Sequence, residues 1–328
     1  MKCINDLRSG LFAALLFLTV FLSGCSSDLT QPYQNEMNVP AFSVGTANSD
    51  SRSTADSFAS DLAVISGDIT GSGAVDSSGT GAAAVISIED KRALYADNVF
   101  SQLYPASLTK VMTAIVALEN ASPDTLLTAS ASVSNLEAGA QAIGLAQGDT
   151  MTLDQALRIL LVYSANDVAV MIAENIGNDA TGFIDMMNRK AAAIGATSTN
   201  FVNSNGLSDN NHYSTAYDMY LIFREAIKIP LFQEIINMNS YSTVYHDSAG
   251  NEKTVNVTST NLYSRGVVTA PAGITVIGGK TGTTSAAGSC LVLLAKDTSG
   301  RSYISVVMRA PGQERLYELT NQLLGEIR

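Results

Sequence analysis

The chain has 328 residues, of which 46% are hydrophobic, and its formal net charge at pH 7 is −11. The apolar content is ample for a sizeable core, whereas the acidic balance argues against a nucleic-acid partner, for which basic patches are expected. The two histidines, His212 and His246, are scattered and offer no convincing zinc or other metal site.

The first 24 residues predict an export signal. After a basic start, Gly10 to Leu22 form an almost unbroken apolar run, which suits a signal-peptide core and is too short to span a bilayer comfortably. The run ends in Leu22-Ser23-Gly24-Cys25, and small residues before a cysteine resemble the lipobox of bacterial lipoproteins. We therefore expect a lipoprotein signal peptide over 1–24 and a lipidated N-terminus at Cys25 that binds the membrane. An ordinary signal peptide with an incidental cysteine is the alternative.

Residues 25–56 predict a flexible tether. Polar residues and proline dominate there, and few large apolar side chains are present to offset the entropy of ordering the chain. One folded domain is expected over 57–328. Because Cys3 leaves with the signal and Cys25 is lipidated, Cys290 has no partner for an internal disulfide, and we expect a small buried hydrophobic side chain there.

Hydrophobic periodicity in the folded part predicts the α+β class. Thr152 and Gln155 form a capping box that should begin one helix, and Gly177 should end the next. Two early strands, a central group of helices, three late strands and a final helix suggest one antiparallel sheet with helices packed on it. The strands are expected over 84–88, 93–96, 275–279, 290–296 and 303–309, and the helices over 107–120, 153–163, 167–176, 183–194, 216–227 and 314–327.

Three short motifs carry the chemistry: Ser107-Leu108-Thr109-Lys110, Ser164-Ala165-Asn166 and Lys280-Thr281-Gly282. Taken singly, they indicate a helix cap, a polar turn between helices and a charged edge strand. Together and in this order they form the motif set of penicillin-binding proteins and related β-lactamases.

The first motif predicts a nucleophile and its base. Ser107 and Lys110 lie three residues apart at a helix start, so their side chains share one face. The helix N-terminus favours negative charge on the serine oxygen. A lysine acts as a base only if its pKa falls, and burial beside a second cation, here Lys280, lowers that pKa.

The other two motifs predict the rest of a catalytic cleft. Ser164 is placed to relay a proton to the leaving group, and Asn166 is placed to hold a substrate amide. A substrate peptide can pair with the edge strand that carries Lys280, Thr281 and Gly282, where glycine permits close approach. The backbone N–H groups of Ser107 and Thr283 are expected to form an oxyanion hole.

With these motifs, the chain resembles the D-alanyl-D-alanine carboxypeptidases, which are low-molecular-mass penicillin-binding proteins, over about Ala84 to Ile327. The segments Leu103-Tyr104-Pro105-Ala106 and His212-Tyr213-Ser214-Thr215, with Asp218, add to the resemblance. It implies a β-lactamase/transpeptidase-like fold, with an antiparallel sheet between helices on both faces and a helical subdomain.

The resemblance also implies a serine peptidase that acts through an acyl-enzyme, without a cofactor. Its substrates would be peptidoglycan stem peptides ending in D-Ala-D-Ala, from which it removes the terminal D-alanine, and β-lactams would inhibit it. Combined with the lipobox, this implies a lipid-anchored protein on the extracytoplasmic face of the bacterial cell membrane. Ser107, Lys110 and Ser164 would then be catalytic. The substrate-binding residues would be Asn166, Lys280, Thr281, Gly282 and Thr283.

The chain departs from many relatives at three places. A structural turn is expected at Asn203-Ser204-Asn205-Gly206-Leu207, where relatives carry Asn-Pro-His-Gly-Leu. Thr260 falls where some relatives place an arginine for the substrate carboxylate, and Arg315 is a loose candidate to replace it. Because the chain ends at Arg328, we expect no β-rich domain or amphipathic tail, and the lipid would replace the tail as anchor.

Three other interpretations remain. His212 could be the base of a Ser-His-Asp triad, although Lys110 already stands beside the serine. The chain could be a β-lactamase, whose deacylating glutamate is followed four residues later by asparagine. That spacing occurs at Glu174 with Asn178 and at Glu252 with Asn256, and we interpret both as chance. A non-catalytic peptidoglycan-binding lipoprotein is the third, against which the intact motifs count.

Overall fold

The computed structural model of the chain describes residues 61–327. The expected signal peptide, Cys25 and the tether therefore lie outside the described residues. The described residues belong to one compact unit, which spans Asp56–Arg328. Within them, no helix combines the length and the apolar character needed to cross a membrane.

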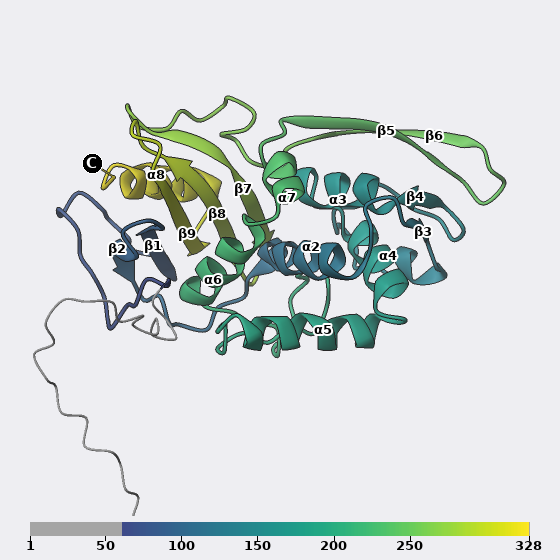
Figure 1. Cartoon of the computed structure of the whole chain (residues 1–328), viewed down its shortest axis with the longest axis horizontal. Coiled ribbons are helices and arrows are strands. Elements are labelled where there is room, and N and C mark those ends of the chain that lie inside the picture. Colours follow the sequence, from purple (N-terminus) through teal and green to yellow (C-terminus); the bar gives the residue numbers. More distant parts are fainter. Residues whose placement is uncertain (1–60, 328) are drawn as a thin grey trace, which may run out of the picture. The chain divides into compact units, whose positions relative to one another are not determined.

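A five-stranded antiparallel sheet forms one half of this unit (Figure 1). The expected strands are all present, and the one expected over 275–279 continues five residues further, so that it carries the whole Lys280-Thr281-Gly282 motif. In spatial order the strands are β2 (Arg92–Asp97), β1 (Ala82–Ser87), β9 (Ser302–Ala310), β8 (Gly288–Lys296) and β7 (Thr275–Thr284). Strand β7 therefore lies at an edge, with one side free of strand pairing.

Helices cover both faces of this sheet, as expected. Successive residues of a strand point to opposite faces, and β1 shows the result. Ala83 and Val85 pack with α8 (Gln313–Leu324), whereas Ala84 and Ile86 belong to the larger core that contains α2 (Thr109–Asn120) and α6 (Ala216–Ala226).

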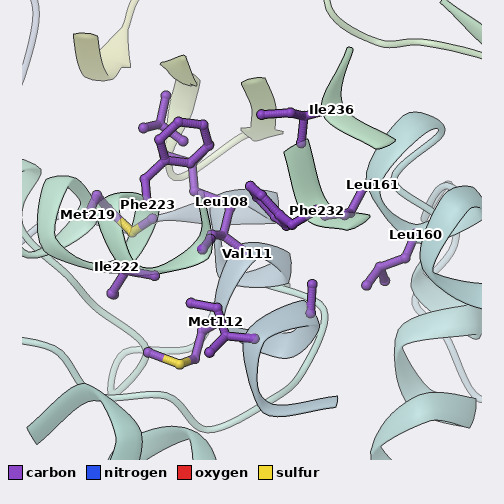
Figure 2. Close-up of a cluster of buried hydrophobic side chains, with 14 of the residues drawn as sticks. Leu108, Val111, Met112, Leu160, Leu161, Met219, Ile222, Phe223, Phe232 and Ile236 are labelled. Carbon is purple, nitrogen blue, oxygen red and sulfur yellow. The ribbon is translucent and has the colours of Figure 1, made fainter. Parts of the chain in front are cut away.

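The larger core joins the sheet to the helical half of the unit. Figure 2 shows Leu108, which directly precedes α2, and Val111 and Met112 of its first turn. They converge with Met219, Ile222 and Phe223 of α6. Burying each such side chain stabilises the fold by about 1.5–3 kcal/mol. The core therefore holds the first turns of α2, and with them Ser107, against the sheet.

The helical half contains the expected helices and one more. Its expected members are α3 (Leu153–Val162), α4 (Asn166–Ile176) and α5 (Ala180–Ala193). The capping box of Thr152 and Gln155 begins α3, and Gly177 ends α4, which confirms both signals. The additional helix is α7 (Pro230–Ile236), whose Phe232 packs edge-to-face on Phe223 with ring centroids 5.8 Å apart.

The expectation of one sheet was wrong, because a second, four-stranded antiparallel sheet is present. It consists of β3 (Leu126–Thr128), β4 (Thr150–Thr152), β5 (Ser240–His246) and β6 (Glu252–Thr258), in that spatial order. Strands β5 and β6 form a hairpin that extends past α3 (Figure 1). Most of its side chains are at least partly exposed, so little core lies behind it.

Candidate active site

Ser107 lies in a single 3-10 turn, Ala106–Leu108, that leads directly into α2. Ala106 adopts φ +48°, a left-handed conformation that is costly for a residue with a side chain. Ser107 lines a cavity of about 450 Å³, which also contains Ser164, Asn166 and the Thr281–Thr284 edge of β7. The three motifs are therefore brought together in one cleft.

Lys110 lies beneath Ser107 and is fully buried. Its Nζ is 2.9 Å from Oγ of Ser107, 2.8 Å from Oδ1 of Asn166 and 2.5 Å from the backbone oxygen of Asn205. The last two atoms can only accept hydrogen bonds. A neutral amine donates its two protons to them and directs its lone pair at the serine hydroxyl. The geometry therefore suits a general base.

The charge state of Lys110 agrees with this geometry. Burial, together with the positive charge of Lys280, holds the pKa of Lys110 well below its usual value of 10.5, although the carboxylate of Asp167 acts in the opposite direction. Lys280 is also fully buried, and burial lowers the pKa of its ammonium group to about 7.

Ser164 and Lys280 form a second hydrogen-bonded pair at the cleft. Nζ of Lys280 donates to Oγ of Ser164 at 2.9 Å and to the backbone oxygen of Thr281 at 2.7 Å. Ser164 has φ +71°, so it follows α3 in a left-handed conformation. Because the Ser164 oxygen accepts from Lys280, its own O–H is free to point into the cleft.

Two residues that the sequence analysis did not single out hold Asn166 in place. The backbone oxygen of Gln141 accepts from the N–H of Asn166 at 2.8 Å and from its Nδ2 at 3.0 Å. Oδ2 of Asp167 accepts from the backbone N–H groups of Gly144 and Leu145. The loop before β4 is thereby tied to the start of α4 and forms one wall of the cleft.

The edge of β7 lies close to the nucleophile. A Cβ atom added to Gly282 would stand 2.9 Å from the backbone nitrogen of Ser107, so only glycine permits this approach. Thr281 and Thr283 flank it and line the cavity. Oγ1 of Thr281 lies 2.5 Å from Oγ1 of Thr260, which places Thr260 in the cleft wall.

The turn at Asn203–Leu207 packs directly under the serine. Gly206 has φ +87°, and a Cβ atom there would lie 1.9 Å from the backbone oxygen of Ala106. Oδ1 of Asn203 accepts from the N–H of Gly206 at 2.7 Å. The expected turn therefore also directs the Asn205 carbonyl to Lys110. A backbone contact of this kind leaves no residue signature in the sequence.

His212 is not in the cleft. Its Nδ1 accepts from the N–H of Val202 at 3.1 Å, so Nε2 carries the proton and faces Oγ1 of Thr109 at 2.7 Å. Burial lowers its pKa to about 4. A buried imidazole with both nitrogens occupied cannot serve Ser107, so the triad interpretation is not supported.

The remaining charged candidates also lie elsewhere. Arg315 pairs with Asp76 at 2.8 Å and with Glu318 at 2.9 Å, and it does not line the cavity. Oε2 of Glu174 accepts from the hydroxyl of Ser130, and neither it nor the glutamate on β6 lines the cavity. The carboxylate that does line it is Glu137. Within 61–327, no group of three His, Cys, Asp or Glu side chains is placed to hold a metal ion.

This cleft agrees with comparisons with known proteins. The family described as D-alanyl-D-alanine carboxypeptidase matches residues 72–312. The chain belongs to that family. The fold resembles that of the Streptomyces K15 DD-transpeptidase, with a TM-score of 0.70 and 24% sequence identity over 79% of this chain and 98% of the other. The α+β, transpeptidase-like fold expected from the sequence is therefore confirmed.

Two curated relatives are named as D-alanyl-D-alanine carboxypeptidases, and a third is named as an endopeptidase. The chain is 30% identical to D-alanyl-D-alanine carboxypeptidase DacF of Bacillus subtilis over 74% of this chain and 60% of the relative. It is 34% identical to DacB2 of Mycobacterium tuberculosis, over 62% of this chain and 66% of the relative. A D-alanyl-D-alanine endopeptidase of Pseudomonas aeruginosa is 30% identical over 70% of each chain. The chain thus spans less than two thirds of the first two relatives.

Proposed function

We propose that the protein is a serine-type D-Ala-D-Ala carboxypeptidase that removes the terminal D-alanine from peptidoglycan stem peptides. The observation that carries this proposal is the 2.9 Å contact between Nζ of Lys110 and Oγ of Ser107, made in a cleft bounded by the free edge of a strand. A buried amine with a lowered pKa can take the serine proton, and a strand edge can bind an extended peptide.

In the proposed acylation, Oγ of Ser107 attacks the carbonyl carbon of the penultimate D-alanine while its proton passes to Nζ of Lys110. The oxyanion forms against the backbone N–H groups of Ser107 and Thr283. Removing one such donor typically costs about 3–4 kcal/mol of transition-state stabilisation. Asn166 would orient the substrate amide.

The C–N bond then breaks as the leaving amine receives a proton. Ser164 gives its own proton to that amine and takes another from Lys110, which becomes neutral again. Lys280 keeps the Ser164 oxygen in place through the 2.9 Å hydrogen bond and remains charged. The departing D-alanine leaves an ester on Ser107.

Hydrolysis of this ester completes the cycle. Neutral Lys110 takes a proton from water, the hydroxyl attacks the ester carbonyl, and the proton returns to Oγ of Ser107. The products are free D-alanine and a peptide shorter by one residue. A cross-linked peptide in place of the terminal D-alanine would make the same chemistry an endopeptidase reaction, as the name of the Pseudomonas aeruginosa relative indicates for that protein.

The proposal is tested by digesting a defined pentapeptide and a cross-linked dimer with purified protein and identifying the products by mass. We expect free D-alanine from the pentapeptide and its loss in Ser107→Ala. Ser248→Ala, in the exposed turn between β5 and β6, is the matched control and should retain activity. Binding without any product from either substrate would instead favour a non-catalytic binding protein.

We further propose that the protein is lipid-anchored on the extracytoplasmic face of the bacterial cell membrane through Cys25. The support is the sequence Leu22-Ser23-Gly24-Cys25 after an apolar run, all of it outside the described residues. In cells grown with a fatty-acid probe, the protein should become labelled. Cys25→Ala should abolish the label and the recovery of the protein in the membrane fraction. Cys3→Ala is the control. Label retained in Cys25→Ala would disprove the anchor.

A further inference from the structure

A second cavity adjoins the Ser107 cleft. Its volume is about 310 Å³, and its polar lining comes from Gln102, Tyr104, Asn210, Tyr213 and Arg309. The two cavities share their walls, because the turn between β7 and β8 and the segment 206–213 contribute residues to both.

The boundary between the two cavities is short. Thr284 and Ser285 of the β7–β8 turn line the Ser107 cleft, whereas the next two residues, Ala286 and Ala287, line the second cavity. Oγ of Ser208 lies 2.8 Å from Oγ1 of Thr284, and this hydrogen bond links the segment 206–213 to the end of β7. A bound peptide that leaves the Ser107 cleft over this turn therefore enters the second cavity directly.

Arg309 reaches this cavity from an irregular place in the sheet. Between the pairs Ser289–Ala310 and Leu291–Val307, two residues of β9 oppose Cys290 alone, which is a β-bulge. At the bulge Arg309 adopts φ +59°, and its N–H contacts Sγ of Cys290. Left-handed conformations cost such residues about 1–3 kcal/mol, and bulges beside active sites commonly redirect a side chain.

The guanidinium group of Arg309 lacks an acidic partner. In the part of the chain that the structure describes, no carboxylate lies within ion-pair distance of it, and the same is true of Arg189 on α5, whereas Arg315 is paired. The neighbouring carboxylate of Asp209 accepts from the backbone N–H of Asn211 and does not line the cavity. A chain with a net charge of −11 thus keeps an unpaired cation at the mouth of a cavity.

The direction of a bound peptide leads to Arg309. In the proposed reaction the leaving D-alanine lies on the side of Ser164 and Lys280, and the scissile carbonyl lies at Thr283. The rest of the peptide then runs antiparallel to β7, toward Thr284 and the turn. An extended peptide advances about 3.3 Å per residue. The third or fourth residue from the C-terminus therefore passes over the turn.

We propose that this cavity is a subsite for a carboxylate group of the stem peptide, upstream of its D-Ala-D-Ala end, with Arg309 as the residue that binds it. The planar guanidinium group suits a carboxylate because it donates two parallel hydrogen bonds. Tyr104 and Tyr213 line the same cavity, where the Tyr104 hydroxyl donates to Oδ1 of Asn210 at 3.1 Å. This inference rests on the proposed function, because that function sets the direction of the peptide.

The test measures binding to the Ser107→Ala protein, so that no turnover interferes. One probe is L-Ala-γ-D-Glu-L-Lys-D-Ala-D-Ala, and the other is the same peptide with the glutamate α-carboxylate converted to an amide. Adding Arg309→Gln should weaken binding of the first probe about tenfold, the usual effect of losing a charge-assisted hydrogen bond. Binding of the amidated probe should not change.

Two further variants separate the subsite from a structural effect. Arg309→Lys keeps the charge and should retain part of the preference for the free carboxylate. Arg189→Gln removes an exposed charge from α5 and should leave both affinities unchanged. Equal weakening of both probes, or no weakening of either, overturns the subsite.

The result also separates this inference from the proposed function. If the wild-type protein releases D-alanine but Arg309→Gln does not discriminate between the probes, the subsite is wrong and the function stands. If the wild-type protein releases no D-alanine while the discrimination persists, the subsite stands and the function is wrong. Failure of the Ser107→Ala protein to bind either probe overturns the subsite, and release of D-alanine by the wild-type protein then decides the function alone.

Discussion

Nζ of Lys110 lies 2.5 Å from the backbone oxygen of Asn205. The position of the proposed base therefore depends on the conformation of the Asn203–Leu207 turn, in which Oδ1 of Asn205 also accepts from the N–H of Leu207. Gly206 holds that conformation, because its φ is +87° and it packs against Ala106. The backbone of this turn thus determines where the Lys110 side chain lies.

Gly206→Ala should disable the site. The added Cβ would lie 1.9 Å from the backbone oxygen of Ala106, so the turn must move away from the serine. A displacement of about 1 Å at a catalytic group can cost 10²-fold in rate. Gly250→Ala is the matched control, because Gly250 has φ +83° but open space around it. Acylation by a fluorescent penicillin should fall only in Gly206→Ala, and equal rates in both variants would contradict this.

Lys110→Arg should slow acylation by about 10²–10⁴, the range typical of losing a general base. Arginine keeps the positive charge but does not lose its proton near neutral pH. Stopped-flow acylation measures the effect, and circular dichroism checks that the variant folds. Near-normal acylation would exclude Lys110 as the base.

The rate of acylation should depend on pH in a bell shape. Lys110 acts when neutral, so the rate falls as the pH drops below its lowered pKa. Lys280 acts as a cation, so the rate also falls as the pH rises through about 7, where its ammonium group loses a proton. Lys280→Arg stays charged and should lose the high-pH limb while keeping the low-pH limb. An unchanged high-pH limb in that variant would assign it to another group.

His212 should make the fold sensitive to acid. Its folded pKa of about 4 lies below the usual 6.5, so protonation favours the unfolded chain. The stabilisation is complete above pH 6.5 and is lost as the pH falls toward 4, by about 3 kcal/mol. Urea unfolding at several pH values should show that the free energy of unfolding falls less steeply with decreasing pH in His212→Asn than in wild type. His246→Asn, at an exposed position, should keep the wild-type slope.

Penicillin should acylate Ser107 and remain attached for minutes or longer. Rapid release of the penicillin-derived ester needs a second base, in addition to Lys110, that activates water. The glutamates of the two Glu-x-x-x-Asn segments do not line the cavity. Glu137 does line it but is exposed to solvent. Intact-protein mass spectrometry should show a lasting adduct on Ser107 in wild type and in Glu137→Gln. Fast turnover without an adduct would favour a β-lactamase.

Local sequence signals predicted much of the fold because they act over a few residues. The capping box joins Thr152 and Gln155, which are only three residues apart, and it forms as expected. The β5–β6 hairpin escaped prediction because each of its strands fully buries only one side chain and so lacks a run of apolar residues. Helix α7 was not predicted because its seven residues are too few to show a helical repeat of apolar positions.

The sequence predicted those parts of the candidate site that are formed by side chains. Ser107, Lys110, Ser164, Asn166 and Lys280 all meet in the cleft, as their motifs indicated. The contacts made by backbone atoms were not predictable, since any residue can present a carbonyl group. Arg315 pairs with Glu318 one helical turn away and with Asp76, and spacing along the chain cannot reveal the long-range pair with Asp76.

Cys290 lies opposite Gly282 in the middle of the sheet, has no exposed surface, and burial raises the pKa of its thiol to about 11. Alkylating reagents react with the thiolate form of cysteine, so Cys290 should not react with maleimides while the protein is folded. Within residues 61–327, a cysteine introduced on the surface would then be the only one to react. A fluorophore attached at the β7–β8 turn could report in real time when a peptide crosses from one cavity to the other.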